Sequence, residues 1–181
     1  MYVQRTKWII GGVMITCSII AMLAGCSDDK IVGPTTDQTA SFQAFLTKAA
    51  TGAGGYAASM NDGDAVAYCA NLDVNFTQLP PDAPPNYGRP AMLVIMTGFF
   101  EALDVEDFTI NTQDFKCLGD MGYSWGLYTF RMAPHGTDLS NLSLWTQVDG
   151  KFESILKQQD DDTWLFYIDA FNSNVAPPPC P

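Results

Sequence analysis

Asp169 is the residue of this chain with the clearest means of doing chemistry. It lies within the run WLFYIDAFN, residues 164–172, which is apolar on both faces if the run forms a strand. Alternation along a strand places Tyr167 and Phe171 on the same face as Asp169. An apolar wall can hold a carboxylic acid neutral or raise the basicity of a carboxylate. Asp169 could therefore act as a general acid or base, or as a polar anchor for a ligand.

A structural role is the alternative for each of these side chains. The Asp169 carboxylate could be buried against a backbone amide or paired with Lys151 or Arg131. Aromatic side chains at strand spacing can fill a core as well as line a pocket. The aromatic candidates for a pocket wall are Phe99, Trp125, Tyr128 and Tyr167.

Other catalytic and metal-binding patterns are missing from the sequence. His135 is the one histidine, which argues against an imidazole metal site and a Ser-His-Asp triad. The acidic run Asp160–Asp162 has the composition of a solvated turn. The glycines between 52 and 55 lack the lysine of a phosphate-binding loop. The sequence therefore predicts neither a metal nor a cofactor.

The first residues have the composition of an export signal. Arg5 and Lys7 precede an uncharged run that is too short for a typical spanning helix of roughly 20 apolar residues. The stretch Leu23–Cys26 resembles the lipobox of bacterial lipoproteins, which implies a signal peptide over 1–25 and lipidation of Cys26. Several acyl chains on one cysteine give stable membrane anchoring. With Ser27 next, the resemblance implies a lipid-anchored protein of the cell envelope, in the outer membrane and facing the periplasm.

The charge of the chain limits its partners. The formal net charge is −11, and it becomes more negative once Arg5 and Lys7 are removed. Such a chain is repelled by nucleic acids and by anionic membrane surfaces, so the lipid alone is expected to hold it at the membrane.

After the predicted signal peptide, the chain divides into a tether over 26–37, one domain over 38–175 and a proline-rich tail over 176–181. An exported chain could oxidise Cys69 with Cys117, leaving Cys180 over. Three unpaired thiols are the alternative.

Helical periodicity comes first along the domain. Apolar residues at helical spacing begin at Phe42, and glycines at 52–55 weaken this first helix, which could be kinked or split there. A short second helix is predicted over 65–70 after the turn Asn61–Asp64, and a third begins at Pro90 with a broad apolar stripe.

Strand patterns follow the helices. After an early strand over 74–79, strands are predicted over 108–116, 123–132, 151–159 and 164–172. Helices followed by an antiparallel meander indicate an α+β domain.

The order and spacing of several short motifs carry a family resemblance over about 41–174. The motifs are Tyr56–Ala65, Leu79–Pro84 with Gly88-Arg89, Gly122-Tyr123 with Gly126, Gly150–Phe152 and Trp164–Ser173. Together they resemble the SnoaL-like, ketosteroid-isomerase-like (nuclear transport factor 2-like) superfamily, in particular its branch of unknown function.

This resemblance implies a cone, in which a curved antiparallel sheet wraps around three N-terminal helices and encloses an apolar pocket. It also implies a homodimer formed through the outer surface of the sheet. Enzymes of the superfamily use a pocket carboxylate, but the position of the isomerase base corresponds here to Gln78, which cannot usefully accept a proton.

We therefore expect a lipid-anchored domain that binds a small apolar or amphipathic ligand without catalysis. The alternative is a cofactor-independent isomerase, lyase or cyclase that uses Asp169.

Overall fold

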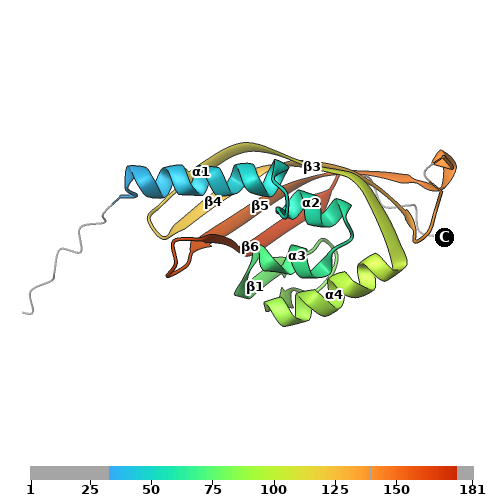
Figure 1. Ribbon diagram of the computed structural model, residues 1–181, viewed down its shortest axis with the longest axis horizontal. Helices are drawn as coiled ribbons and strands as arrows, with labels where there is room; N and C mark the ends of the chain where they lie inside the picture. Colours follow the sequence, from blue (N-terminus) through green and yellow to red (C-terminus); the bar gives the residue numbers. More distant parts are fainter. Residues whose placement is uncertain (1–32, 139, 175–181) are drawn as a thin grey trace, which may run out of the picture. The chain divides into compact units, whose positions relative to one another are not determined.

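The computed structural model describes residues 33–138 and 140–174. The predicted signal segment 1–25, the lipidation residue Cys26 and the tail 176–181 with Cys180 lie outside these residues. The elements follow one another as helices α1–α4 with β1 and β2 between them, then the long strands β3–β6 (Figure 1).

The first predicted helix is split in two. α1 (Thr36–Thr51) begins two residues before the predicted domain start, and a capping box between Thr35 and Gln38 fixes its first turn. Gly52 ends α1, and α2 (Tyr56–Asn61) starts after Gly55. A Cβ atom on Gly55 would lie 2.0 Å from the Lys48 carbonyl oxygen, so this tight break between the helices requires glycine. The described part of the chain thus has four α-helices before the long strands, because the first of the three predicted helices is split at the glycines, one of the outcomes that the sequence allowed.

Short capped elements connect these helices to the sheet. Asp64 accepts hydrogen bonds from the backbone of Val66 and Ala67, both at 2.9 Å, and starts α3 (Ala65–Ala70), which has the predicted bounds. β1 (Leu72–Leu79) begins two residues earlier than predicted, and β2 (Asn86–Tyr87) is a short strand within the proline-rich loop that the sequence did not predict. α4 (Arg89–Ala102) follows directly.

The sheet has six strands in the order β2-β1-β6-β5-β4-β3. β3 (Leu103–Cys117), β4 (Met121–Pro134), β5 (Thr146–Gln158) and β6 (Trp164–Ser173) form the predicted antiparallel meander, and a short 3₁₀ helix (Leu142–Leu144) precedes β5. β1 pairs with β6 in parallel, so the sheet is mixed and not wholly antiparallel. It is curved and unclosed, as Figure 1 shows, which confirms the predicted α+β class.

The core lies between the helices and the concave face of this sheet. Phe42 of α1 is fully buried, with its ring centroid 4.7 Å from that of Trp164 and 5.9 Å from that of Phe115. Cys69 and Cys117 are both buried and free, so the predicted alternative of a disulfide between them is wrong.

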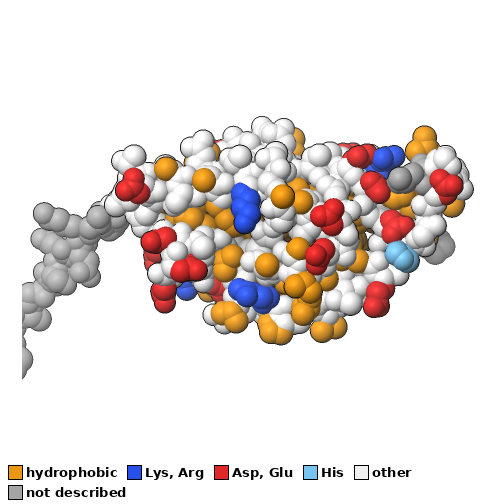
Figure 2. All heavy atoms as spheres, in the orientation of Figure 1, with side chains coloured by type: hydrophobic (Ala, Val, Ile, Leu, Met, Phe, Trp, Pro, Cys, Tyr) orange, Lys and Arg blue, Asp and Glu red, His pale blue; other side chains and the backbone are white. Residues whose placement is uncertain are grey.

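The surface combines scattered acidic groups with an apolar strip. Figure 2 shows apolar side chains gathered along α4, where Leu93, Val94 and Ile95 are exposed. No helix within the described residues is long and apolar enough to cross a membrane.

Candidate functional site

A cavity of about 340 Å³ opens inside the cone, between the helices and the concave face of the sheet. This volume is at the lower end of the range, about 300–1,000 Å³, that is typical of sites for small molecules. The cavity extends from buried side chains such as Ser154 to residues near the surface, including Ile95 of α4, which is 39% exposed. The predicted internal hollow is therefore present.

The wall of this cavity is aromatic and nearly uncharged. Asp169 is the one charged side chain on it, and no lysine, arginine or histidine lines it among the described residues. Nine aromatic side chains contribute: Tyr56, Tyr68, Phe99, Phe108, Tyr128, Phe130, Phe152, Phe166 and Phe171. Such a wall favours an apolar ligand body and disfavours an anion.

A row of polar side chains crosses the concave face of the sheet and interrupts this apolar wall. Ser124 of β4 is paired in register with Ser154 of β5, Ser154 with Asp169 of β6, and Asp169 with Gln78 of β1. Side chains that are directly opposite on adjacent strands point to the same face, and all four line the cavity. The Oγ atom of Ser124 is buried without a hydrogen-bond partner among the described residues. The cavity thus has one polar side in an apolar enclosure.

Asp169 is at the centre of the polar row and is only 7% exposed. The Oγ–H of Ser154 donates to its Oδ1 at 2.6 Å, and no other hydrogen bond to the Asp169 carboxyl group is present among the described residues. Burial raises the pKa of Asp169 to about 7, against a smaller opposite effect of the Ser154 hydrogen bond. The carboxyl group therefore changes its charge near neutral pH.

Neither of the basic residues proposed as structural partners reaches Asp169. Arg131 instead pairs with Asp107 at 2.5 Å, and Lys151 is exposed. The alternative of an ion pair between Asp169 and either residue is therefore wrong for this structure.

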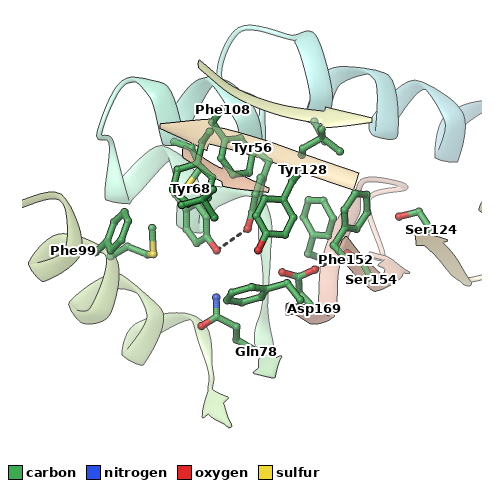
Figure 3. A pocket seen from close by; sticks show the side chains of 18 of the residues that line it. Tyr56, Tyr68, Gln78, Phe99, Phe108, Ser124, Tyr128, Phe152, Ser154 and Asp169 are labelled. Atoms are coloured by element: carbon green, nitrogen blue, oxygen red, sulfur yellow. Dashed lines mark hydrogen bonds between the residues drawn. The ribbon is translucent and has the colours of Figure 1, made fainter. Parts of the chain in front are cut away.

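Three tyrosine hydroxyl groups point toward the same part of the cavity as the Asp169 carboxylate (Figure 3). The hydroxyl groups of Tyr56 and Tyr68 are hydrogen-bonded to each other at 2.9 Å, and burial raises the pKa of both. The hydroxyl group of Tyr128 donates to the Asn172 carbonyl oxygen at 3.2 Å, and burial also raises its pKa, with a further increase from the charge of Asp169. These hydroxyl groups are neutral hydrogen-bonding groups near pH 7.

Three of the five predicted pocket residues lie on the cavity wall. They are Phe99, Tyr128 and Asp169. Trp125 and Tyr167 do not line the cavity, which corrects the predicted pocket. Trp125 is 44% exposed, next to the cavity-lining Ser124 on β4.

A bulge in β6 explains the position of Tyr167. Ile155 pairs with Ile168, whereas the next residue of β5, Leu156, pairs with Phe166, so Tyr167 is an extra residue in the ladder. The alternation of side chains between the two faces of β6 therefore shifts by one residue at the bulge. Phe166, and not Tyr167, lines the cavity together with Asp169 and Phe171. The Lys157 ammonium group lies 5.8 Å from the centre of the Tyr167 ring.

Sequence reasoning missed several residues of the site. Tyr56 and Tyr68 lie on short helices, and Ser154 lies in a strand whose pairing register decides what it faces. The only signal for the tyrosines was their helical spacing from apolar neighbours. Gln78, the expected position of the isomerase base, does lie on the wall, where its Oε1 accepts a hydrogen bond from Asn86 at 2.9 Å.

No family model matches the chain, and no curated protein matches it. Solved structures do. A ketosteroid isomerase-like protein from Erwinia carotovora atroseptica is 14% identical, with a TM-score of 0.58 over 76% of this chain and 94% of that one. A conserved protein from Planctomyces limnophilus is 11% identical, with a TM-score of 0.61 over 77% of this chain and 99% of that one.

A third similar structure is a dehydratase candidate of the NTF2-like family from Streptomyces avermitilis. It is 14% identical, with a TM-score of 0.56 over 78% of this chain and all of that one. Fold and cavity together define an α+β protein with an internal pocket under a curved sheet. The fold is the NTF2-like cone, as the motif resemblance implied.

Proposed function

We propose that this domain binds a small apolar or amphipathic molecule in the cavity of the cone. The observation that carries the proposal is a largely apolar hollow of about 340 Å³ that the core side chains leave unfilled. Protein interiors are normally close-packed, and a void of this size forfeits contacts on all its walls. The four polar residues of the row would orient the polar end of the bound molecule.

A second candidate function is proton transfer by Asp169 in a cofactor-independent isomerase, lyase or cyclase. Its support is a buried carboxyl group whose pKa is raised to about 7, which suits a general acid or base at neutral pH. The names of the ketosteroid isomerase-like and dehydratase structures are consistent with this candidate. Against it, no tyrosine is hydrogen-bonded to Asp169 among the described residues.

One NMR experiment tests binding and proton transfer together. The purified chain is mixed in D₂O with 1-tetralone, a neutral bicyclic ketone with exchangeable hydrogens beside its carbonyl group. We expect saturation transfer from the protein to the ketone, because its rings suit the aromatic wall. Exchange of those hydrogens above the protein-free rate would support the second candidate if it disappears in Asp169→Asn.

The matched control fills the cavity from the helix side. Ala49 of α1 is buried and lines the cavity, so Ala49→Phe should weaken ketone binding at least tenfold while circular dichroism stays unchanged. Undiminished binding to a folded Ala49→Phe variant would place the ketone elsewhere and contradict the proposed site.

We further propose that the chain is exported and anchored in the outer membrane by lipid on Cys26, and that it forms a homodimer. The support is the sequence of residues 1–27 and the resemblance described above. Labelled fatty acid should enter the wild-type chain in cells and not a Cys26→Ser variant; equal labelling of both would refute lipidation at this residue. Native mass spectrometry of the same material would show the dimer.

A further inference from the structure

An ionised Asp169 has no counter-charge in the described structure. Its pKa is governed by burial and by the Ser154 hydroxyl group, with no contribution from a basic residue. Arg131 is paired with Asp107, and Lys157 lies beside the Tyr167 ring. A buried charge is normally paired, so the carboxylate lacks the partner that such a site usually supplies.

The aromatic wall suits a cation more than it suits any other charged group. The face of an aromatic ring carries negative electrostatic potential and attracts ammonium groups, most strongly where water is excluded. Tyr56, Tyr68 and Tyr128 approach Asp169 from α2, α3 and β4, so carboxylate and aromatic rings lie around the same volume (Figure 3). The net charge of −11 adds a long-range attraction for cations.

We propose that the ligand of this cavity carries an ammonium group on a small apolar body, with the ammonium group against Asp169 and the Tyr56–Tyr68 pair. This inference rests on the proposed binding function and names its ligand class. A neutral ligand would leave the carboxylate unpaired or require it to be protonated. An ammonium group supplies the missing charge, and the hydroxyl oxygens of the surrounding side chains can accept its hydrogen bonds.

The charge state of Asp169 should control the affinity for such a ligand. The groups that face it are Ser154 from β5, Gln78 from β1 and the three tyrosines, which are neutral between pH 5 and 8 because burial raises the pKa of their hydroxyl groups. Asp169 is then the group of the site that titrates in this range, and ammonium binding should strengthen as pH rises. With a free-state pKa of about 7, linkage allows a loss of up to about a hundredfold in affinity between pH 8 and pH 5.

Three probes that differ only in their head group test this inference. Octylammonium, octan-1-ol and octanoate are titrated into the purified full chain at pH 8 by isothermal calorimetry. We expect octylammonium to bind at least tenfold more tightly than octan-1-ol, and octanoate not to bind. The octylammonium affinity should fall at pH 5 as stated, whereas that of octan-1-ol should not fall.

The control variant is Asp169→Asn, which keeps the shape of the side chain and removes the charge. It should bind octylammonium no better than octan-1-ol and show no pH dependence, while circular dichroism verifies its fold. Equal or tighter binding of octan-1-ol to the wild type overturns the ammonium inference and leaves the proposed binding function standing. A pH-independent octylammonium affinity in the wild type also overturns it, whether or not the variant folds. Failure of all three probes to bind contradicts both proposals.

Discussion

Asp169→Asn is expected to be more stable than the wild-type domain at pH 8, by about 2–4 kcal/mol, and no more stable at pH 4. Burial raises the pKa of Asp169 from 3.8 to about 7 in the folded domain. The folded state therefore holds this proton more tightly than the unfolded chain does, and its contribution to stability is complete below pH 4 and is lost as pH rises through 7. The shift corresponds to roughly 4 kcal/mol, since each pKa unit is worth about 1.4 kcal/mol. An unpaired amide in the variant would offset part of the gain.

Urea unfolding of both proteins at several values between pH 4 and pH 8 measures this difference. Other acids titrate in both proteins, so the difference between the two free energies of unfolding isolates Asp169. Asp160→Asn, at an exposed position in the turn before β6, serves as the control and should follow the wild type throughout. A variant that is less stable than the wild type at pH 8 would show that the Ser154–Asp169 hydrogen bond outweighs the cost of burial.

The expected gain in stability of Asp169→Asn at pH 8 would also indicate why the carboxyl group is present. A buried acid that costs stability at neutral pH has no structural benefit there, and perturbed acids of this kind concentrate at functional sites. Replacement by asparagine would then stabilise the fold and remove the proposed ammonium binding, which is the usual conflict between a site and the stability of its scaffold.

The sequence predicted the elements of this fold well because its patterns are local. The Asp64 cap and the apolar periodicity of α4 each depend on residues within one or two turns, and α3 has its predicted bounds. The predicted break at residues 52–55 became a full separation of α1 from α2, because the chain at Gly55 passes too close to the Lys48 carbonyl oxygen for a Cβ atom. The parallel pairing of β1 with β6 joins residues about 90 positions apart, and no local pattern specifies it.

The residues of the site were less predictable because they depend on the pairing register of the strands. Asp169 is distinctive as a carboxylate in an apolar run, but a single-residue bulge moved Tyr167 off the face that period-two alternation gave it. Ser154 and Ser124 are ordinary strand residues in sequence, and only the pairing of three strands aligns them with Asp169. The pairing between distant strands therefore decides which side chains line the cavity, and no local pattern in the sequence specifies that pairing.

The interior of the domain has a closely packed region, where Phe42 lies, and a cavity, whose wall includes Phe152. Phe42 is fully buried, and its ring centroid lies 4.7 Å from that of Trp164 and 5.9 Å from that of Phe115, so its surroundings are tightly packed. Phe152 of β5 is half-buried and lies on the cavity wall. Truncating a packed side chain creates a new void, whereas truncating one beside an existing hollow only enlarges it.

Phe42→Ala is therefore expected to destabilise the domain by about 3–5 kcal/mol, and Phe152→Ala by less than about half of that. Both substitutions remove the same atoms, so the difference in the free energy of urea unfolding measures the packing around each ring. Phe42→Leu, which keeps most of the volume, should recover much of the loss caused by Phe42→Ala. Equal losses for Phe42→Ala and Phe152→Ala would mean that side chains pack around Phe152 as closely as around Phe42. In that case the cavity would be closed in solution, and a binding function based on it would have to be abandoned.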